Sequence, residues 1–591
     1  MATGQPSTRP WLPYSVAVVA GLAVIAAAYV IVRPAPGADR ASCVALEVNS
    51  STEKDQLLGQ LAGRYNTSDR RFGGRCAQVT VHGLNSGKAM EALAAGNWAG
   101  RQPTIPAPQV WLPTSSLWTS RLRVLDEQAG RPAQTAEPRY PSIANSPLVI
   151  AMPREKGELV RQKGPLGWAD LLGLSGDQGW AAFGKPAWGR FTFGKDNPNL
   201  STSGLAATIA TYYAAVGRSS DLTEADLAKP GVTQFVRRIE ANVSHYSDDS
   251  VDLLRDLAEA DLGAGGDARA RDMSAVVVQE ELVYQYNEGQ LSPKLGEKPR
   301  VPLVAVHPKE GTFNLDHPYV VLPSADEAQQ AAAQDFLTFL QDLPQQRSFA
   351  ELGFRDHERR PSDALVAAVR GGSGTELVYF DPPEPEVVDA ILRGWGTLRK
   401  KANILLAVDT SGSMNARVGG STRFKVATAA ATKGVSLLNS ADQVALWSFS
   451  SETPQRPKKP YSEAVRLGPF NQAGFTRSLT GLRVEGNTAL YATVRAAHRH
   501  LLDNYDPDRI NAVVVLTDGK NEYPKDSDLA RLLKDIALDP ERPVKVFCVA
   551  FDRESDLNAL DRIAKASAGK AFDATDPATI DEAFVKLVSS F

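Results

Sequence analysis

One unbroken strand pattern that ends in oxygen-bearing side chains constrains this chain more than any other feature. Residues 403–408 (Asn-Ile-Leu-Leu-Ala-Val) are typical of a strand buried on both faces. A D-x-S-x-S motif follows at once, and a threonine and a second aspartate recur 79 and 109 residues after its first residue. The candidate ligands are Asp409, Ser411, Ser413, Thr488 and Asp518. Two carboxylates and three hydroxyls suit a hard cation such as Mg²⁺ or Mn²⁺.

The last part of the chain, residues 400–591, alternates apolar runs with amphipathic segments, which predicts a doubly wound parallel sheet covered by helices on both faces. Ligands of such folds lie at the carboxyl ends of strands, where Asp409 and Asp518 fall. The expected strands are Asn403–Val408, Gln443–Phe449, Ile510–Leu516, Val544–Phe551 and Ala571–Asp573, with an edge strand near Ala464–Leu467. The expected helices are Phe424–Leu438, Leu490–Leu502, Asp526–Ile536, Leu557–Ala566 and Ile580–Val588.

Three short segments, Asp409–Ser413, Gly486–Leu490 and Leu516–Gly519, closely resemble the von Willebrand factor type A (VWA) domain. That family holds a divalent cation in a metal-ion-dependent adhesion site formed by D-x-S-x-S, a distant Thr and a distant Asp. The resemblance implies that the five candidate ligands bind Mg²⁺, Mn²⁺ or Ca²⁺. It also implies one coordination position open to an acidic group of a partner protein. The alternative is that these residues are turn and helix-capping residues only.

Hydrolytic chemistry is the competing interpretation of the same serines. A nucleophilic serine would need a histidine and a sharp turn such as G-x-S-x-G, and neither Ser411 nor Ser413 lies in that motif. The nearest histidines, His498 and His500, are two residues apart on an expected helix and so do not share a face. No Cys/His spacing typical of zinc occurs either. We therefore expect a binding protein and not an enzyme.

The region from residue 43 to 380 alternates expected strands and helices, and it resembles a two-lobed bacterial extracellular solute-binding protein of the type that serves ABC transporters. The resemblance is carried by segments 48–53, 85–87, 146–151, 197–204 and 274–280. It implies a cleft in which loops that enter helices present hydroxyl and N–H groups to a solute. The candidate ligand-binding residues are Ser50, Ser51, Ser86 and Ser203.

The type of solute stays open. Helix N-termini favour anions, whereas Glu280 and Glu281 near the expected cleft would oppose a bare anion. An amino acid, a peptide or no ligand at all are the alternatives, and the four serines could instead be ordinary helix caps. Trp111 and Trp118 could line the cleft, although a core role is favoured.

An uncharged run near the N-terminus predicts a membrane anchor. Residues 14–32 are long enough to cross a hydrocarbon layer of about 30 Å at 1.5 Å per residue. A cleaved signal peptide is the alternative, but its apolar region is normally shorter. The expected order is a cytoplasmic tail (1–13), an anchor (14–32), a tether (33–42), a solute-binding domain (43–380), a proline-rich linker (381–399) and a VWA domain (400–591). Most of the chain would then lie outside the cytoplasm, attached to the plasma membrane.

The cysteines fit an oxidising compartment. Cys43 and Cys76 could form a disulfide that closes a loop of 33 residues and stabilises the fold by about 3–4 kcal/mol; two buried thiols are the alternative. Cys548 lies in a strand pattern and is expected to be an inert core residue. Segment 371–374 (Gly-Gly-Ser-Gly) lacks the Lys-Ser/Thr of a phosphate loop and is expected to be a turn.

Charge excludes one class of partner. With 65 basic and 68 acidic residues the net charge is −3, which gives no basic excess for nucleic acid. The leading interpretation is a membrane-anchored protein that binds a partner protein through a metal and carries a solute-sensing domain. The alternative is a solute receptor of an ABC transport system.

Overall fold

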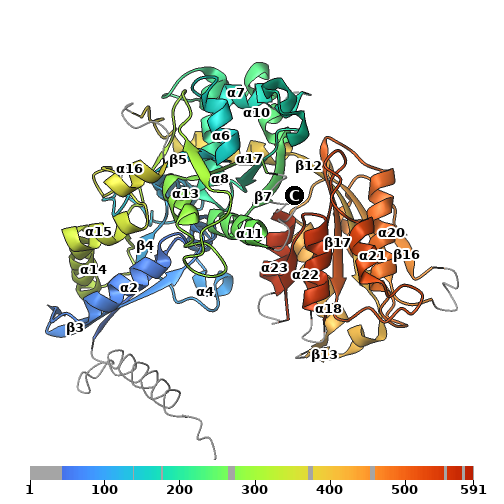
Figure 1. The fold of residues 1–591 in the computed structure, drawn as a ribbon. Coiled ribbons are helices and arrows are strands. Elements are labelled where there is room, and N and C mark those ends of the chain that lie inside the picture. Colours follow the sequence, from blue (N-terminus) through green and yellow to red (C-terminus); the bar gives the residue numbers. More distant parts are fainter. Residues whose placement is uncertain are drawn as a thin grey trace, which may run out of the picture.

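The computed structural model describes residues 43–589, except 138, 175–177, 264–272, 370–376, 419, 453–458, 552–554 and 576–579. The expected anchor (14–32) and the expected glycine turn (371–374) lie outside the described residues. Among the residues that are described, no helix is both long enough and apolar enough to cross a membrane. The described chain forms an N-terminal α/β region of two lobes and a C-terminal α/β domain (Figure 1).

Lobe 1 is built on a five-stranded sheet in the order β11-β4-β1-β3-β2. The strands are β1 (Val44–Ser50), β2 (Arg71–Phe72), β3 (Arg75–Gly83), β4 (Val110–Leu112) and β11 (Val320–Val321). The helices of this lobe are α2 (Asp55–Asn66), α3 (Ser86–Ala94), α4 (Trp98–Arg101), α5 (Ser116–Gln128), α14 (Glu327–Gln341) and α15 (Leu343–Glu351). The central strand β1 pairs in parallel with β3 and β4, so the loops after these strands lie along one edge of the sheet. A disulfide joins Cys43 to Cys76 at the other end of β1 and β3, as the sequence predicted.

Lobe 2 is built on a six-stranded sheet in the order β10-β5-β8-β6-β7, with β9 also paired to β5. The strands are β5 (Ser146–Pro153), β6 (Phe193–Asp196), β7 (Val243–Ser247), β8 (Ala275–Gln279), β9 (Leu303–Val306) and β10 (Asn314–Leu315). The helices are α6 (Arg154–Arg161), α7 (Trp168–Leu174), α8 (Thr202–Val216), α9 (Glu224–Leu227), α10 (Pro230–Ala241), α11 (Ser250–Leu262), α13 (Glu280–Asn287) and α16 (Asp363–Val369), with short 3-10 turns at Gly179–Phe183 and Pro186–Trp188. The chain enters lobe 2 from lobe 1 and returns to it, which is why β11, α14 and α15 belong to lobe 1.

The C-terminal domain has the doubly wound sheet that the sequence predicted. Its order is β16-β15-β12-β17-β18-β19, parallel except for the edge strand β16. The strands are β12 (Lys401–Asp409), β15 (Gln443–Phe449), β16 (Tyr461–Val465), β17 (Arg509–Thr517), β18 (Val544–Ala550) and β19 (Ala571–Asp573), with a separate hairpin of β13 (Arg417–Val418) and β14 (Ser421–Thr422). The helices are α18 (Arg423–Val435), α19 (Gln472–Thr480), α20 (Leu490–Asp503), α21 (Leu529–Asp535), α22 (Leu557–Ala566) and α23 (Ile580–Ser589), with a 3-10 turn at Gly412–Asn415.

Both faces of this sheet are buried, as the unbroken apolar run of β12 requires. Ile404 and Leu406 face one way and pack in the same core as Phe424 of α18 and Phe584 of α23. The neighbouring residue Leu405 faces the other way, in a core that includes residues of α20, α21 and α22. Alternate residues of β12 thus pack against the helices on opposite faces of the sheet.

The expected linker at 381–399 is only in part a linker. Its proline-rich start leads into α17 (Pro385–Leu398), in which Pro385 takes a first-turn position that needs no backbone N–H. The apolar face of α17 is buried against lobe 2 and α5, and Trp395 makes an edge-to-face contact with Tyr246 at a ring-centroid distance of 5.5 Å. The prediction was wrong here because proline density fixes where a helix can start but does not prevent one from starting.

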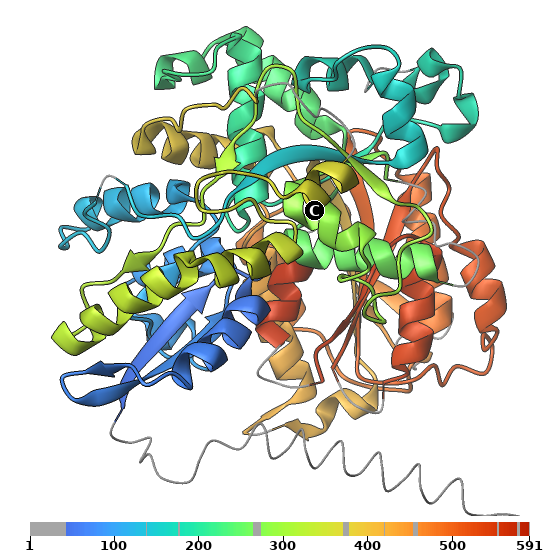
Figure 2. The same cartoon turned by 60° about the vertical axis from the view of Figure 1, so that its left-hand side comes forward.

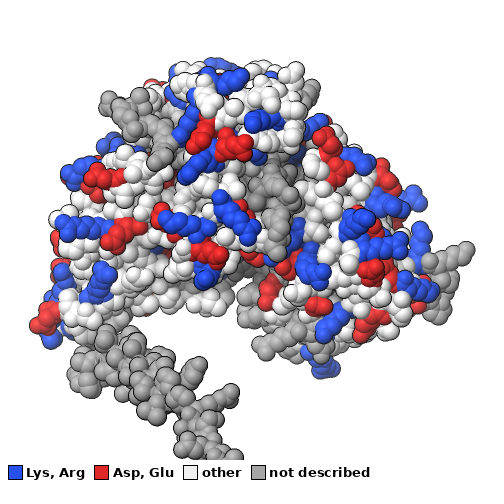
Figure 3. Space-filling model, in the orientation of Figure 1, with Lys and Arg blue, Asp and Glu red and all other residues white. Residues whose placement is uncertain are grey.

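The two regions are packed against each other along α11 and β7 of lobe 2 (Figures 1 and 2). Lys570 forms an ion pair with Asp256 at 2.7 Å, and Lys545 donates to the backbone carbonyl of Ser244 at 2.8 Å. The face drawn in Figure 3 intersperses basic and acidic side chains over its described residues and shows no large patch of one sign. That distribution agrees with the absence of a basic excess in the sequence.

Candidate metal site and interlobe cleft

The five predicted metal ligands come together at the carboxyl ends of the central strands of the C-terminal domain. Asp409 is the last residue of β12, and Asp518 directly follows β17, which pairs with β12 in parallel. Thr488 lies two residues before α20 and is buried. Parallel pairing places strand ends at a common edge, and this brings together residues that are more than 100 positions apart.

A chain of hydrogen bonds joins four of these side chains. Thr488 Oγ1 donates to Ser411 Oγ at 3.1 Å, and Ser411 Oγ lies 3.0 Å from Ser413 Oγ. Ser413 Oγ in turn donates to Asp518 Oδ1 at 2.8 Å. Asp409 is oriented by its neighbours, because its Oδ1 accepts from the Ser411 backbone N–H at 2.8 Å and its Oδ2 from Thr517 Oγ1 at 2.6 Å. The sequence motif therefore forms one compact cluster of oxygen atoms.

Two glycines allow the loops to approach so closely. Gly486 has φ of +78°, which a residue with a side chain rarely adopts, and its carbonyl accepts from the Gly412 N–H at 2.8 Å. At Gly519 an added Cβ would lie 2.9 Å from Thr488 Oγ1. Larger residues at either place would displace Thr488 or the D-x-S-x-S loop.

The cluster carries more acid than base. Burial raises the pKa of Asp409 to about 7, against hydrogen bonds from Thr517 and Ser411 that lower it. Burial also raises the pKa of Asp518, although Ser413 and Arg423 oppose this shift. Arg423 Nη1 contacts Asp518 Oδ2 at 3.0 Å, whereas no basic side chain contacts Asp409 among the described residues. A site with two carboxylates and one guanidinium favours a further cation.

This oxygen set fits a divalent cation of the Mg²⁺, Mn²⁺ or Ca²⁺ type. The ligands are neutral hydroxyls and carboxylates, with neither sulfur nor imidazole. Within the described part of the chain no cluster of three or more His, Cys, Asp or Glu residues has metal-site geometry, as expected for a site that depends on hydroxyls. Nucleophilic chemistry gains no support, because Ser413 donates to a carboxylate and not to a histidine.

Two of the four serines predicted for the solute cleft line it in the structure, and two do not. Ser51 and Ser86 line a small polar cavity between the lobes. Ser50 lies beneath it and donates to the Ser51 carbonyl at 3.0 Å, and Ser203 is fully buried and hydrogen-bonded to Ser250 Oγ at 2.9 Å. Asn85, not Ser86, caps α3, so the capping alternative is wrong for Ser86.

Other residues expected near the cleft are engaged elsewhere. Glu280 binds Arg355 and His307, and Glu281 is hydrogen-bonded to Ser146. Trp111 is a fully buried core residue, which confirms the favoured prediction. Trp118 is also buried, but its indole N–H donates across the lobes to Thr202 Oγ1 at 2.7 Å.

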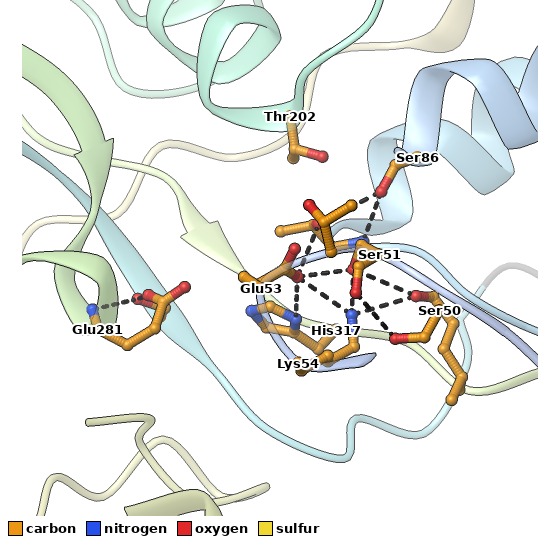
Figure 4. A network of polar contacts seen from close by, with 12 residues as sticks. Ser50, Ser51, Glu53, Lys54, Ser86, Thr202, Glu281 and His317 are labelled. Carbon is orange, nitrogen blue, oxygen red and sulfur yellow. Dashed lines mark hydrogen bonds and ion pairs between the residues drawn. The ribbon is translucent and has the colours of Figure 1, made fainter. Parts of the chain in front are cut away.

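Sequence reasoning missed Glu53, which lines this cleft, and its buried partners Lys54 and His317 (Figure 4). Glu53 and Lys54 form a buried ion pair at 3.1 Å, and His317 Nδ1 lies 3.4 Å from the same carboxylate. Burial lowers the pKa of His317 to about 4, helped by the Lys54 charge, so the imidazole is neutral at pH 7. Glu53 belonged to a segment that carried the family resemblance, but no pattern distinguished it from a surface glutamate.

A further buried acid lies beside the cleft in lobe 2. Asp196 ends β6, and its Oδ2 accepts hydrogen bonds from Ser201 at 2.6 Å and from Ser250. Burial raises its pKa to about 8, against those hydrogen bonds. The side chain is therefore largely protonated at pH 7 and adds little charge to the cleft.

Comparison with known proteins agrees with this division of the chain. A model of the bacterial extracellular solute-binding protein family matches residues 46–355, and a model of the von Willebrand factor type A domain matches residues 403–586. The first match covers just over half of the 591 residues. The molecule is thus a two-lobed binding domain joined to a VWA domain. The chain belongs to the bacterial extracellular solute-binding protein family.

Individual relatives are distant. An uncharacterized protein of Bacillus subtilis, YwmC, is 28% identical over 192 residues, which is 31% of this chain and 82% of that protein. The periplasmic binding protein AfuA from Actinobacillus pleuropneumoniae, solved with fructose-6-phosphate, is 14% identical with a TM-score of 0.40 and is matched over 60% of this chain and 99% of its own. A VWA protein from Catenulispora acidiphila is 21% identical with a TM-score of 0.26, over 32% of this chain and 42% of its own.

Proposed function

We propose that this chain is a membrane-anchored binding protein that acts outside the cytoplasm and recognises a partner protein through a divalent cation. Asp409, Ser411, Ser413, Thr488 and Asp518 would hold Mg²⁺, Mn²⁺ or Ca²⁺. The bound cation would supply a Lewis-acidic position for an acidic side chain of the partner. The observation that carries the proposal is the cluster of the five oxygen ligands at one sheet edge, in which four side chains are hydrogen-bonded in a chain and Asp409 accepts from the Ser411 backbone N–H.

Location outside the cytoplasm is supported by two features. The uncharged run at 14–32 is long enough for an anchor, and a disulfide between Cys43 and Cys76 fits an oxidising compartment. A binding role, and not catalysis, is supported by the hydrogen-bond partners of the two motif serines, which are hydroxyls and a carboxylate.

The test is crosslinking and affinity capture from native membranes with the full chain. Wild type is compared with Asp409→Ala, each in Mg²⁺ and in chelator. We expect a partner that is captured by wild type in Mg²⁺ and lost in the other three conditions. Asp508→Ala changes an exposed aspartate of the same domain and should capture like wild type. Equal capture by Asp409→Ala and wild type in Mg²⁺ would refute the proposal.

The second candidate is a solute receptor of an ABC transport system. The match of residues 46–355 to the solute-binding family favours it. In this structure the lobes have closed on a cavity of about 10 Å³, close to the size of one water molecule. Binding of a solute in this cavity therefore requires opening of the lobes, and equilibrium dialysis of wild type against small solutes would detect a receptor role as saturable binding.

A further inference from the structure

Side chains of the protein fill most of the interlobe cleft around Ser51 and Glu53, and a second pocket of about 190 Å³ lies beside it, between Asp55 of lobe 1 and Arg255 of lobe 2. Polar side chains from both lobes line the remaining 10 Å³ of the cleft, among them Ser51, Glu53 and Thr114 from lobe 1 and Ser201, Thr202 and Gln279 from lobe 2. The lobes also touch directly. Thr52 Oγ1 donates to Asp249 Oδ2 at 2.6 Å, and the Gly87 N–H donates to the Leu200 carbonyl at 3.0 Å. A Cβ at Gly87 would lie 2.5 Å from that carbonyl oxygen, so the two lobes are in direct contact at this point.

Three donors on the lobe 1 side converge on one acceptor (Figure 4). Glu53 Oε1 accepts from Ser51 Oγ at 2.6 Å, from Thr114 Oγ1 at 3.0 Å and from Lys54 Nζ at 3.1 Å. Two hydroxyls and an ammonium group around one anionic oxygen are the chemistry that recognises a carboxylate or a small oxyanion. Ser51 was a predicted ligand-binding residue, and its hydroxyl is used here for a carboxylate of the chain.

The ion pair between Glu53 and Lys54 is buried and is not a surface contact. The Lys54 side chain is fully buried and that of Glu53 nearly so. Burial alone would raise the pKa of Glu53, but the Lys54 charge and His317 outweigh it and hold this pKa well below its usual range. A buried ammonium group needs an anion close by, and the anion is supplied from the neighbouring residue of the same chain.

We propose that the Glu53 carboxylate permanently occupies the anion-binding position of lobe 1, so that the wild-type domain takes no free carboxylate or oxyanion there. The hydrogen-bond donors and the positive charge at this position are all used by Glu53, which takes the place of a solute there. The inference concerns the solute-binding domain alone. Its failure would leave the metal-dependent recognition proposed for the VWA domain unaffected.

Removal of this internal anion should create a binding site. Glu53→Ala deletes Cγ and the carboxylate, and acetate supplies those atoms as a separate molecule. We expect the melting temperature of full-length Glu53→Ala to fall by more than about 5 °C, because Lys54 loses its partner. Acetate should then raise it in a saturable manner, by roughly 2 °C or more at a hundredfold excess over its Kd. Acetamide, which lacks the charge, should not.

Two controls define the result. Glu47→Ala removes a half-buried glutamate of the same lobe that is paired with His82, and acetate should have no effect on that variant. Glu53→Gln keeps the volume of the side chain, so acetate should not bind to it either. Failure of folded Glu53→Ala to bind acetate more tightly than Glu47→Ala would overturn the proposal.

A titration of the wild-type protein is the second test, and the conservative variant Glu53→Gln serves only to locate any binding signal. Isothermal titration of wild type with acetate, phosphate and sulfate should give no saturable heat. Saturable binding of any of these anions that Glu53→Gln alters would show that the position exchanges with solvent, and would overturn the proposal.

Discussion

The interlobe cleft and the oxygen cluster of the VWA domain use the same kind of side chain and differ in their charge balance. In both, serine and threonine hydroxyls at the ends of parallel strands surround a carboxylate. In the cleft, Glu53 is matched by the buried cation Lys54. In the VWA cluster, two carboxylates lie near one guanidinium, that of Arg423, which contacts Asp518 at 3.0 Å. Serine and threonine hydroxyls therefore indicate that a site is polar. The balance of charged side chains indicates whether a bound ligand is needed to neutralise that site.

The largest effect should come from the cleft, where the ion pair is sealed from water. Lys54→Met keeps much of the side-chain volume but leaves Glu53 buried without its partner. We expect a loss of about 3–5 kcal/mol in the free energy of unfolding, measured by chemical denaturation. The double variant Glu53→Gln/Lys54→Met should recover a large part of it. Lys298→Met, which breaks an exposed pair with Glu288, should cost no more than about 1 kcal/mol.

A loss in the free energy of unfolding for Lys54→Met as small as that for Lys298→Met would contradict this prediction. That result would mean that water reaches the pair and that the cleft is not electrostatically closed.

The second effect concerns the metal. Asp409→Asn removes one of the two carboxylates while it keeps the shape of the side chain. We expect Mg²⁺ affinity to fall by more than about 100-fold, or about 2.7 kcal/mol, measured by isothermal titration of wild type and variant. Asp508→Asn is the control and should bind like wild type. Unchanged Mg²⁺ binding by Asp409→Asn would show that the cation lies elsewhere.

The third effect is a pH dependence of the cleft region. The folded-state pKa of Asp196 is raised to about 8 by burial, so between pH 4 and 8 the folded state holds a proton that the unfolded state releases. Stability from this group is thus highest at low pH and falls as pH rises, by up to about 1.4 kcal/mol per pH unit. Asp196→Asn cannot ionise and should show a flatter pH profile. Melting temperatures at pH 5 and pH 8 test this, and parallel profiles of the two proteins would contradict it.

The smallest effect should come from the guanidinium in the VWA cluster. Arg423 repels a cation that binds beside Asp518, because the two positive charges would share one carboxylate. Arg423→Gln should therefore raise Mg²⁺ affinity by about threefold to tenfold, which isothermal titration can resolve. A loss of affinity would instead assign Arg423 a supporting role in the geometry of Asp518.

The residues of the VWA cluster could be predicted from the sequence because short motifs next to recognisable strands identify them. The apolar run of β12 fixes the strand, the motif that follows fixes the loop, and parallel pairing determines that Asp409 and Asp518 meet. Arg423 escaped prediction, because its contact with Asp518 joins residues 95 positions apart and follows no motif.

The cleft was predicted less well because its decisive contacts depend on how the lobes pack. The motif segment around Ser50–Glu53 was correctly placed at the cleft, but its serines alone were taken as functional. His317 and Thr114 reach Glu53 from segments that only the folded chain brings together. Only the three-dimensional structure shows that Glu53 accepts hydrogen bonds from Ser51, Thr114 and Lys54.

One diffraction experiment tests both sides of the comparison. Crystals of the full-length protein soaked in Mn²⁺ would reveal bound cations by anomalous scattering. We expect a Mn²⁺ peak within bonding distance of the Ser411 and Ser413 hydroxyls in the VWA domain, and an interlobe cleft in which Glu53 still accepts from Lys54. A Mn²⁺ peak bound to Glu53, or no peak at Ser411 and Ser413, would contradict it.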